Sequence, residues 1–81
     1  MKKAYTVNIK RYIPQGKSIS AALSDIQYLH GEETRTTRYI LTRAMKGGVL
    51  SNPSIECLCE LRNLASFYAS DPSIKIDDIL E

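Results

Sequence analysis

The chain has 81 residues and a formal net charge of +2, which allows one domain with a small core and excludes a multidomain protein. Its apolar runs are far shorter than the ~20 residues that a transmembrane helix needs, so we expect no membrane partner. Cys57 and Cys59 are two positions apart in a predicted helix and therefore point in different directions. We expect two reduced thiols, no metal site, no cofactor and a cytoplasmic protein.

The charge is divided unevenly along the chain. Residues 1–46 carry nine lysines and arginines against three acidic residues, whereas residues 47–81 carry two against six. The first part is therefore charged +6 and the second −4. A basic half followed by an acidic third predicts two surfaces with different partners.

The first predicted element is a strand over residues 4–13, because apolar and polar side chains alternate there with period two. Pro14 ends it. One face of the strand is apolar and the other is polar: Tyr5, Val7 and Ile9 lie on the first, Thr6, Asn8 and Lys10 on the second.

Two helices are predicted next, each ended by glycine. The first contains the apolar positions Ile19, Ala22, Leu23, Ile26 and Leu29 and ends at His30-Gly31. The second contains the apolar positions Ile40, Leu41, Ala44 and Met45 and ends at Gly47. The candidate N-cap residues are Ser18 or Ser20 for the first helix and Thr34 or Thr36 for the second.

A third helix is predicted over residues 55–69, with Asn52 as its N-cap and Pro53 at its first position. A short fourth turn is expected around residues 76–80. The leucine stripe of the third helix completes the core of its own molecule or contacts neighbouring copies; the pattern favours the first. We therefore divide the single domain into a region of residues 1–48 and a helical extension of residues 49–81.

The predicted strand has no second strand to pair with in the sequence, and a lone strand with an apolar face is unstable. Antiparallel pairing with the same strand of a second copy, about a two-fold axis, is the simplest remedy. The sequence thus predicts a mainly α homodimer with one N-terminal strand in each copy. The expected dimer core consists of Tyr5, Val7, Ile9, Ile40, Leu41 and Ala44.

A two-stranded antiparallel ribbon fits the major groove of B-DNA. The polar face formed by Thr6, Asn8 and Lys10 carries side chains that suit the edges of base pairs, and Lys2 and Lys3 precede it. We expect the first three to read bases and the two lysines to contact phosphate. The alternative is a solvated strand face, which would also be polar.

The start of the second helix offers a phosphate-binding site, since free backbone N–H groups at a helix N-terminus bind anions. Hydroxyls and guanidiniums are concentrated there. The expected phosphate contacts are Arg35, Thr36, Thr37 and Arg38. Ordinary capping by threonine, with two solvated arginines, is the alternative.

The order strand, helix, helix, with a threonine-rich start to the second helix, resembles the ribbon-helix-helix DNA-binding proteins over residues 4–46. The segment Thr34-Arg35-Thr36-Thr37-Arg38-Tyr39-Ile40-Leu41-Thr42-Arg43-Ala44-Met45 is similar to their second helix. A narrower resemblance is to the ParR/StbB plasmid partition adaptors. It is carried by Gly31-Glu32, Arg35, Arg38, Leu41-Thr42, Leu58-Cys59-Glu60-Leu61 and Ile76-Asp77-Asp78-Ile79-Leu80.

This resemblance implies a ribbon-helix-helix homodimer with additional C-terminal helices, encoded by a bacterial plasmid or phage. It implies binding to repeated centromere-like sites on double-stranded DNA as an array, capture of an actin-like filament, and repression of the protein's own operon. Thr6, Asn8 and Lys10 would occupy the reading strand, and Thr36 and Thr37 the phosphate-binding helix start. In those adaptors a C-terminal tail that contacts the filament lies beyond the point where this chain stops.

Two other functions remain open. One is a ribbon-helix-helix repressor or antitoxin of plasmid or phage origin, in which the C-terminal third contacts a partner. The other is a protein-interaction module whose strand joins the sheet of another protein. We expect no enzyme, because His30 is the only histidine and stands beside a helix-ending glycine without a nucleophile to activate.

Overall fold

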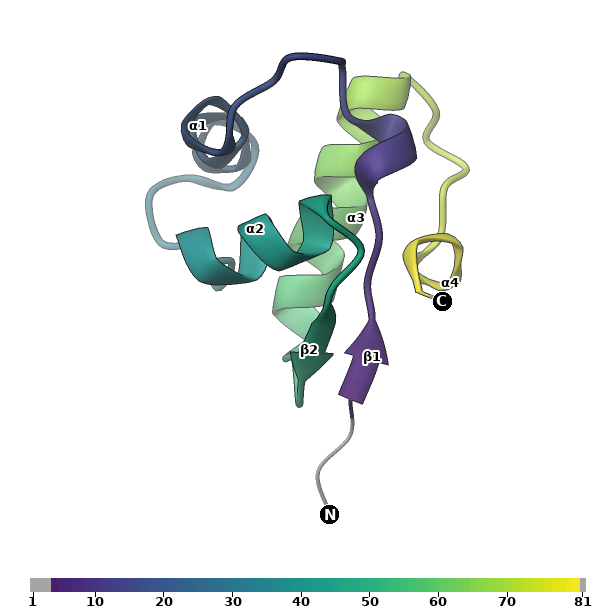
Figure 1. The fold of residues 1–81 in the computed structure, drawn as a ribbon. Helices are drawn as coiled ribbons and strands as arrows, with labels where there is room; N and C mark the ends of the chain where they lie inside the picture. The colour runs from purple at the N-terminus through teal and green to yellow at the C-terminus, as the bar shows by residue number, and fades with distance from the viewer. Residues whose placement is uncertain (1–3, 81) are drawn as a thin grey trace.

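The computed structural model describes residues 4–80, in which two short strands and four α-helices surround one core (Figure 1). About half of these residues are helical, and no helix among them is long and apolar enough to cross a membrane. The elements, in chain order, are β1 (Ala4–Thr6), the 3-10 helix η1 (Lys10–Tyr12), α1 (Ile19–His30), α2 (Arg38–Met45), β2 (Val49–Ser51), α3 (Ile55–Ala69) and α4 (Ile76–Ile79).

The chain supplies its own partner for the N-terminal strand. β1 pairs with β2 in antiparallel register, with Tyr5 opposite Leu50. The expectation of a single strand is therefore wrong. β2 escaped prediction because three residues directly after a glycine pair are too few to show alternation. The strand predicted over residues 4–13 is also shorter, since it ends at Thr6 and the chain tightens into η1.

Both edges of the segment that follows β1 are occupied within the molecule. The N–H groups of Val7 and Ile9 donate to the carbonyls of Gly48 and Ala44, each at 3.0 Å, on the side of α2 and β2. The N–H of Asn8 donates in the opposite direction, to the carbonyl of Ile79 at 2.8 Å. The ribbon between two copies was predicted from unpaired strand edges, and within residues 7–9 the backbone N–H groups already have acceptors in the same chain.

Serine and threonine side chains begin the three longer helices. Ser18 accepts the N–H of Ala21 at the start of α1, which confirms one of its two candidate caps. The predicted caps of the next two helices are wrong, because Thr37 begins α2 and Ser54 begins α3. Asn52 instead adopts a positive φ of 54° in the turn before α3.

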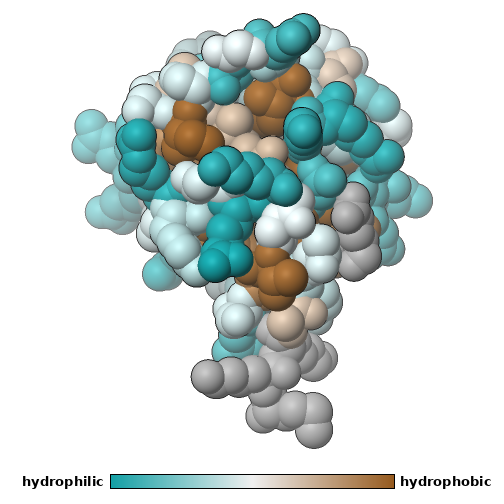
Figure 2. All heavy atoms as spheres, viewed as in Figure 1, coloured by the Kyte–Doolittle hydropathy of each residue, from teal (hydrophilic) through white to brown (hydrophobic). Residues whose placement is uncertain are grey.

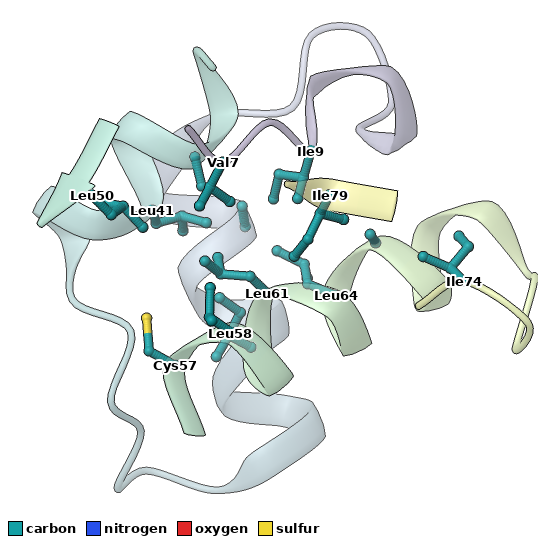
Figure 3. Packing of buried hydrophobic residues seen from close by; sticks show 14 residues of the cluster. Val7, Ile9, Leu41, Leu50, Cys57, Leu58, Leu61, Leu64, Ile74 and Ile79 are labelled. Carbon is teal, nitrogen blue, oxygen red and sulfur yellow. The ribbon is translucent and has the colours of Figure 1, made fainter. Parts of the chain in front are cut away.

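The core is built around α3, and elements on both sides of residue 48 contribute to it (Figure 3). Val7, Ile9, Leu41 and Ala44, which were expected to form a dimer core, are fully buried inside one chain. Tyr5 and Ile40 are partly buried against the same cluster. The remaining buried apolar residues are Ala22, Ile26, Leu50, Cys57, Leu58, Leu61, Leu64, Ala65, Ile74 and Ile79.

A polar contact joins α1 to α3 at the edge of this core. The hydroxyl of Tyr68 donates to the Asp25 carboxylate, whose Oδ2 also lies 3.1 Å from Lys17 Nζ. The hydrogen bond from Tyr68 is the largest cause that lowers the pKa of Asp25 below its ordinary value of 3.8, and Lys17 acts in the same direction. Burial and the same contact raise the pKa of Tyr68.

This contact predicts an acid-sensitive part of the free energy of unfolding. Because the folded-state pKa of Asp25 is lowered, its contribution is present above pH 3.8 and is lost as the pH falls through the lowered value. Urea unfolding of the native chain and of the Tyr68→Phe variant, between about pH 5 and about pH 2, measures this contribution to the free energy of unfolding. Over this interval the free energy of unfolding should fall less for Tyr68→Phe than for the native chain. Equal falls in the two proteins would show that the contact contributes nothing.

Candidate nucleic-acid interface

The structure does not bring Thr6, Asn8 and Lys10 together on one extended strand. Thr6 lies in β1, whereas Lys10 is exposed in η1. Asn8 is half-buried between them, and its Oδ1 accepts the N–H of Lys10 at 2.9 Å. Lys2 and Lys3, the lysines predicted to contact phosphate, lie outside the described residues.

The backbone amides of Arg35 and Thr36, two of the four residues predicted to contact phosphate at the start of α2, are occupied by a carboxylate of the same chain. Glu60 Oε1 accepts the N–H of Thr36 at 2.8 Å, and the two carboxylate oxygens accept the N–H of Arg35 at 3.0 and 2.9 Å. Thr36 itself is only 2% exposed. These amides and the Thr36 side chain are therefore not accessible to DNA in this structure, which corrects that part of the predicted site.

The exposed side of α2 forms a different surface, which we call the α2 face. The helix points Leu41 and Ala44 into the core. The residues of the α2 face, all exposed except the half-buried Thr42, are Arg38, Tyr39, Thr42, Arg43 and Lys46. It contains three cations and no carboxylate. Figure 2, in the same view as Figure 1, shows hydrophilic residues interspersed with hydrophobic ones on the side of the molecule that carries α2.

Side chains of the α2 face are held in place before any ligand arrives. Arg43 Nε donates to the hydroxyl of Tyr39 at 2.7 Å, and its guanidinium lies 5.0 Å from the centre of that ring. Arg43 Nη1 also reaches the carbonyl of Val49 at 3.4 Å. Arg38 Nη1 donates to Ser20 Oγ at 2.9 Å, so the first turn of α2 is tied to α1.

A hollow lies beside the α2 face, between α2 and β2. It is lined by Thr37, Tyr39, Ile40, Arg43, Val49, Leu50, Ser51 and Pro53. Hydroxyl and guanidinium groups stand at this hollow together with apolar side chains. This mixture of side chains suits a ligand whose surface carries both phosphate oxygens and apolar groups.

Two acidic residues of the C-terminal third, Asp77 and Asp78, lie away from this surface. Asp77 and Asp78 are in α4, and α4 and α2 lie on opposite sides of the N-terminal strand (Figure 1). The hydrogen bonds of residues 7–9 give the same arrangement, because they reach α2 and β2 on one side and Ile79 on the other. The carboxylates of α4 are therefore separated in space from the cations of the α2 face.

Sequence reasoning found Arg38 but missed the other four members of the α2 face. A usable signal was present, since Tyr39, Arg43 and Lys46 recur at helical spacing between the buried positions. The prediction was based instead on the polar start of the helix and on the polar strand face, so it did not include these residues. Comparison of the chain with protein-family models, with curated proteins and with solved structures finds no match.

Proposed function

We propose that this protein binds double-stranded DNA through the α2 face. The observation that carries the proposal is one short helix that, with its C-cap residue Lys46, presents three cations and a tyrosine to solvent beside the half-buried Thr42, with no carboxylate among them. The major groove of B-DNA admits an α-helix. Arginine and lysine neutralise phosphates and donate to guanine, and threonine contacts bases through its hydroxyl and methyl groups.

The helix suits this role better than the N-terminal strand does. A reading ribbon over the whole predicted strand would need a second copy to pair along residues 7–9 too, where Gly48, Ala44 and Ile79 already accept the backbone N–H groups. The α2 face needs no such rearrangement. Its side chains stand on a helix that is anchored by two fully buried residues, Leu41 and Ala44.

The narrower proposal is a plasmid partition adaptor that binds centromere-like repeats, links them to an actin-like filament and represses its own operon. It is supported by the resemblance of residues 31–61 to the ParR/StbB adaptors. A plain repressor or antitoxin would use the same α2 face. The two differ in the architecture of the DNA site, because an adaptor requires an array of repeats and a repressor only a short pair of half-sites.

Selection of bound duplexes from fragmented plasmid and genomic DNA at about 150 mM salt tests the proposal. We expect one sequence to be enriched, as a tandem array for an adaptor or as a single short pair for a repressor. With three cations on the α2 face, the logarithm of affinity should fall against that of salt with a slope of about −2 to −3. Recovery of no preferred sequence would contradict sequence-specific binding and favour the protein-interaction module.

A further inference from the structure

Glu60 is a buried carboxylate that holds the segment leading into α2. We propose that it is a positioning residue for DNA binding, which acts by fixing the direction in which α2 presents its face. This inference rests on the proposed function and adds to it a residue that does not touch DNA. It also assigns to α3 a second role beyond filling the core.

The contact between Glu60 and the segment before α2 is strong, because two consecutive backbone amides donate to one carboxylate. Arg35 N and Thr36 N donate to the Glu60 carboxylate over distances of 2.8 to 3.0 Å. Glu60 is only 7% exposed, and hydrogen bonds to charged groups are stronger than those between neutral groups. The one salt bridge within residues 4–80 joins Lys17 to Asp25, so backbone amides rather than a cation satisfy Glu60.

A second contact ties the same segment to α3. Thr36 Oγ1 lies 3.7 Å from the sulfur of Cys57, one turn before Glu60 on the helix. Thr37 then caps α2, and Arg38 is the first residue of that helix. The contact with α3 is therefore two residues from the first cation of the α2 face, and little chain is available to absorb a displacement.

A glutamine in place of Glu60 keeps one oxygen that can accept these N–H groups, but its NH2 group is a donor that would face the Arg35 N–H in place of the second oxygen. It also lacks the negative charge that strengthens both bonds. Buried donors that lose their partners are costly, so the segment would move outward to find water. Arg38 and the start of α2 would move with it. DNA binding then loses the alignment on which several simultaneous contacts depend.

The test compares Glu60→Gln with Glu56→Gln, an exposed glutamate one turn earlier on the same helix. Each variant removes one negative charge, and electrostatics alone would strengthen binding to DNA in both. We expect Glu60→Gln to weaken affinity for the selected duplex about tenfold, which is 1.4 kcal/mol, and Glu56→Gln to leave it unchanged or slightly stronger. Equal or tighter binding by Glu60→Gln would overturn the inference.

Glu60→Asp provides a test that keeps the charge, since it only withdraws the carboxylate by one methylene. It should also weaken binding, by less than Glu60→Gln; unchanged binding would again contradict the inference. If Glu60→Gln does not fold, the affinity of Glu60→Asp for the duplex tests the inference on its own.

Amide hydrogen exchange without DNA separates this inference from the proposed function. The N–H groups of Arg35 and Thr36 should exchange slowly in the native chain and faster in Glu60→Gln, while amides in the middle of α3 stay protected. Fast exchange in the native chain would overturn the positioning role whatever the protein binds. A native chain that binds no duplex would instead overturn the proposed function.

Discussion

Replacing Arg43 by alanine is expected to weaken binding to the preferred duplex by ~1–3 kcal/mol and to relax the preference at one base position. The reason is that Arg43 is exposed and already held by Tyr39 and the Val49 carbonyl, so little freedom is lost when it donates to a guanine. Fluorescence anisotropy on the preferred duplex, and on duplexes altered one base pair at a time, measures both effects.

Lys75→Ala is the matched control, because it removes the same unit charge from the start of α4, away from the α2 face. It should change affinity only through long-range electrostatics, which salt screens. Equal losses from Arg43→Ala and Lys75→Ala would show that net charge, rather than the α2 face, governs binding. Arg43 is exposed, so its replacement should leave stability within about 0.5 kcal/mol of the native value.

Leu61→Ala is expected to lower the free energy of unfolding by ~2–5 kcal/mol. Leu61 is fully buried near the centre of α3, where Val7 and Ile9, α2 and α4 also contribute to the core (Figure 3). A domain of this length has a total of about 4–12 kcal/mol, so the loss removes a large fraction of its stability. Urea unfolding followed by circular dichroism measures it.

Ile55→Ala is the control on the same helix, since Ile55 is 61% exposed. It removes a side chain of the same volume and should change the free energy of unfolding by less than about 0.5 kcal/mol. Similar losses from the two variants would mean that Ile55 is covered in solution, for example by a second copy of the chain. An unfolding midpoint that rises with protein concentration would then show that a second copy of the chain covers Ile55.

The helices were predictable because each carries a local signal. Apolar spacing located α1 and α3, and Ser18 was among the two predicted caps of α1. The pairing of β1 was not predictable in this way. Three residues contain no period, and the partner strand lies more than forty positions along the chain, so only tertiary contacts make β2 a strand.

The candidate site shows the same division between local and long-range causes. A polar strand face and a threonine-rich helix start are visible in the sequence, but their exposure depends on what packs over them. Thr36 became inaccessible because Glu60, 24 residues further on, accepts its amide. Glu60 was itself a signal, since a charged residue stands within the apolar stripe between Cys57 and Leu61. A buried carboxylate requires partners, and here they are the amides of Arg35 and Thr36, two of the residues predicted to contact phosphate.

The central claim, that the α2 face is the surface that meets DNA, is tested most directly by nuclear magnetic resonance. Backbone amide signals of the labelled chain are followed while the selected duplex is added. The account predicts that the largest shifts and line broadening fall on residues 38–46, with small changes at Thr6, Asn8 and Lys10. Largest changes at those three residues, with α2 unaffected, would contradict the account and return the reading role to the N-terminal segment.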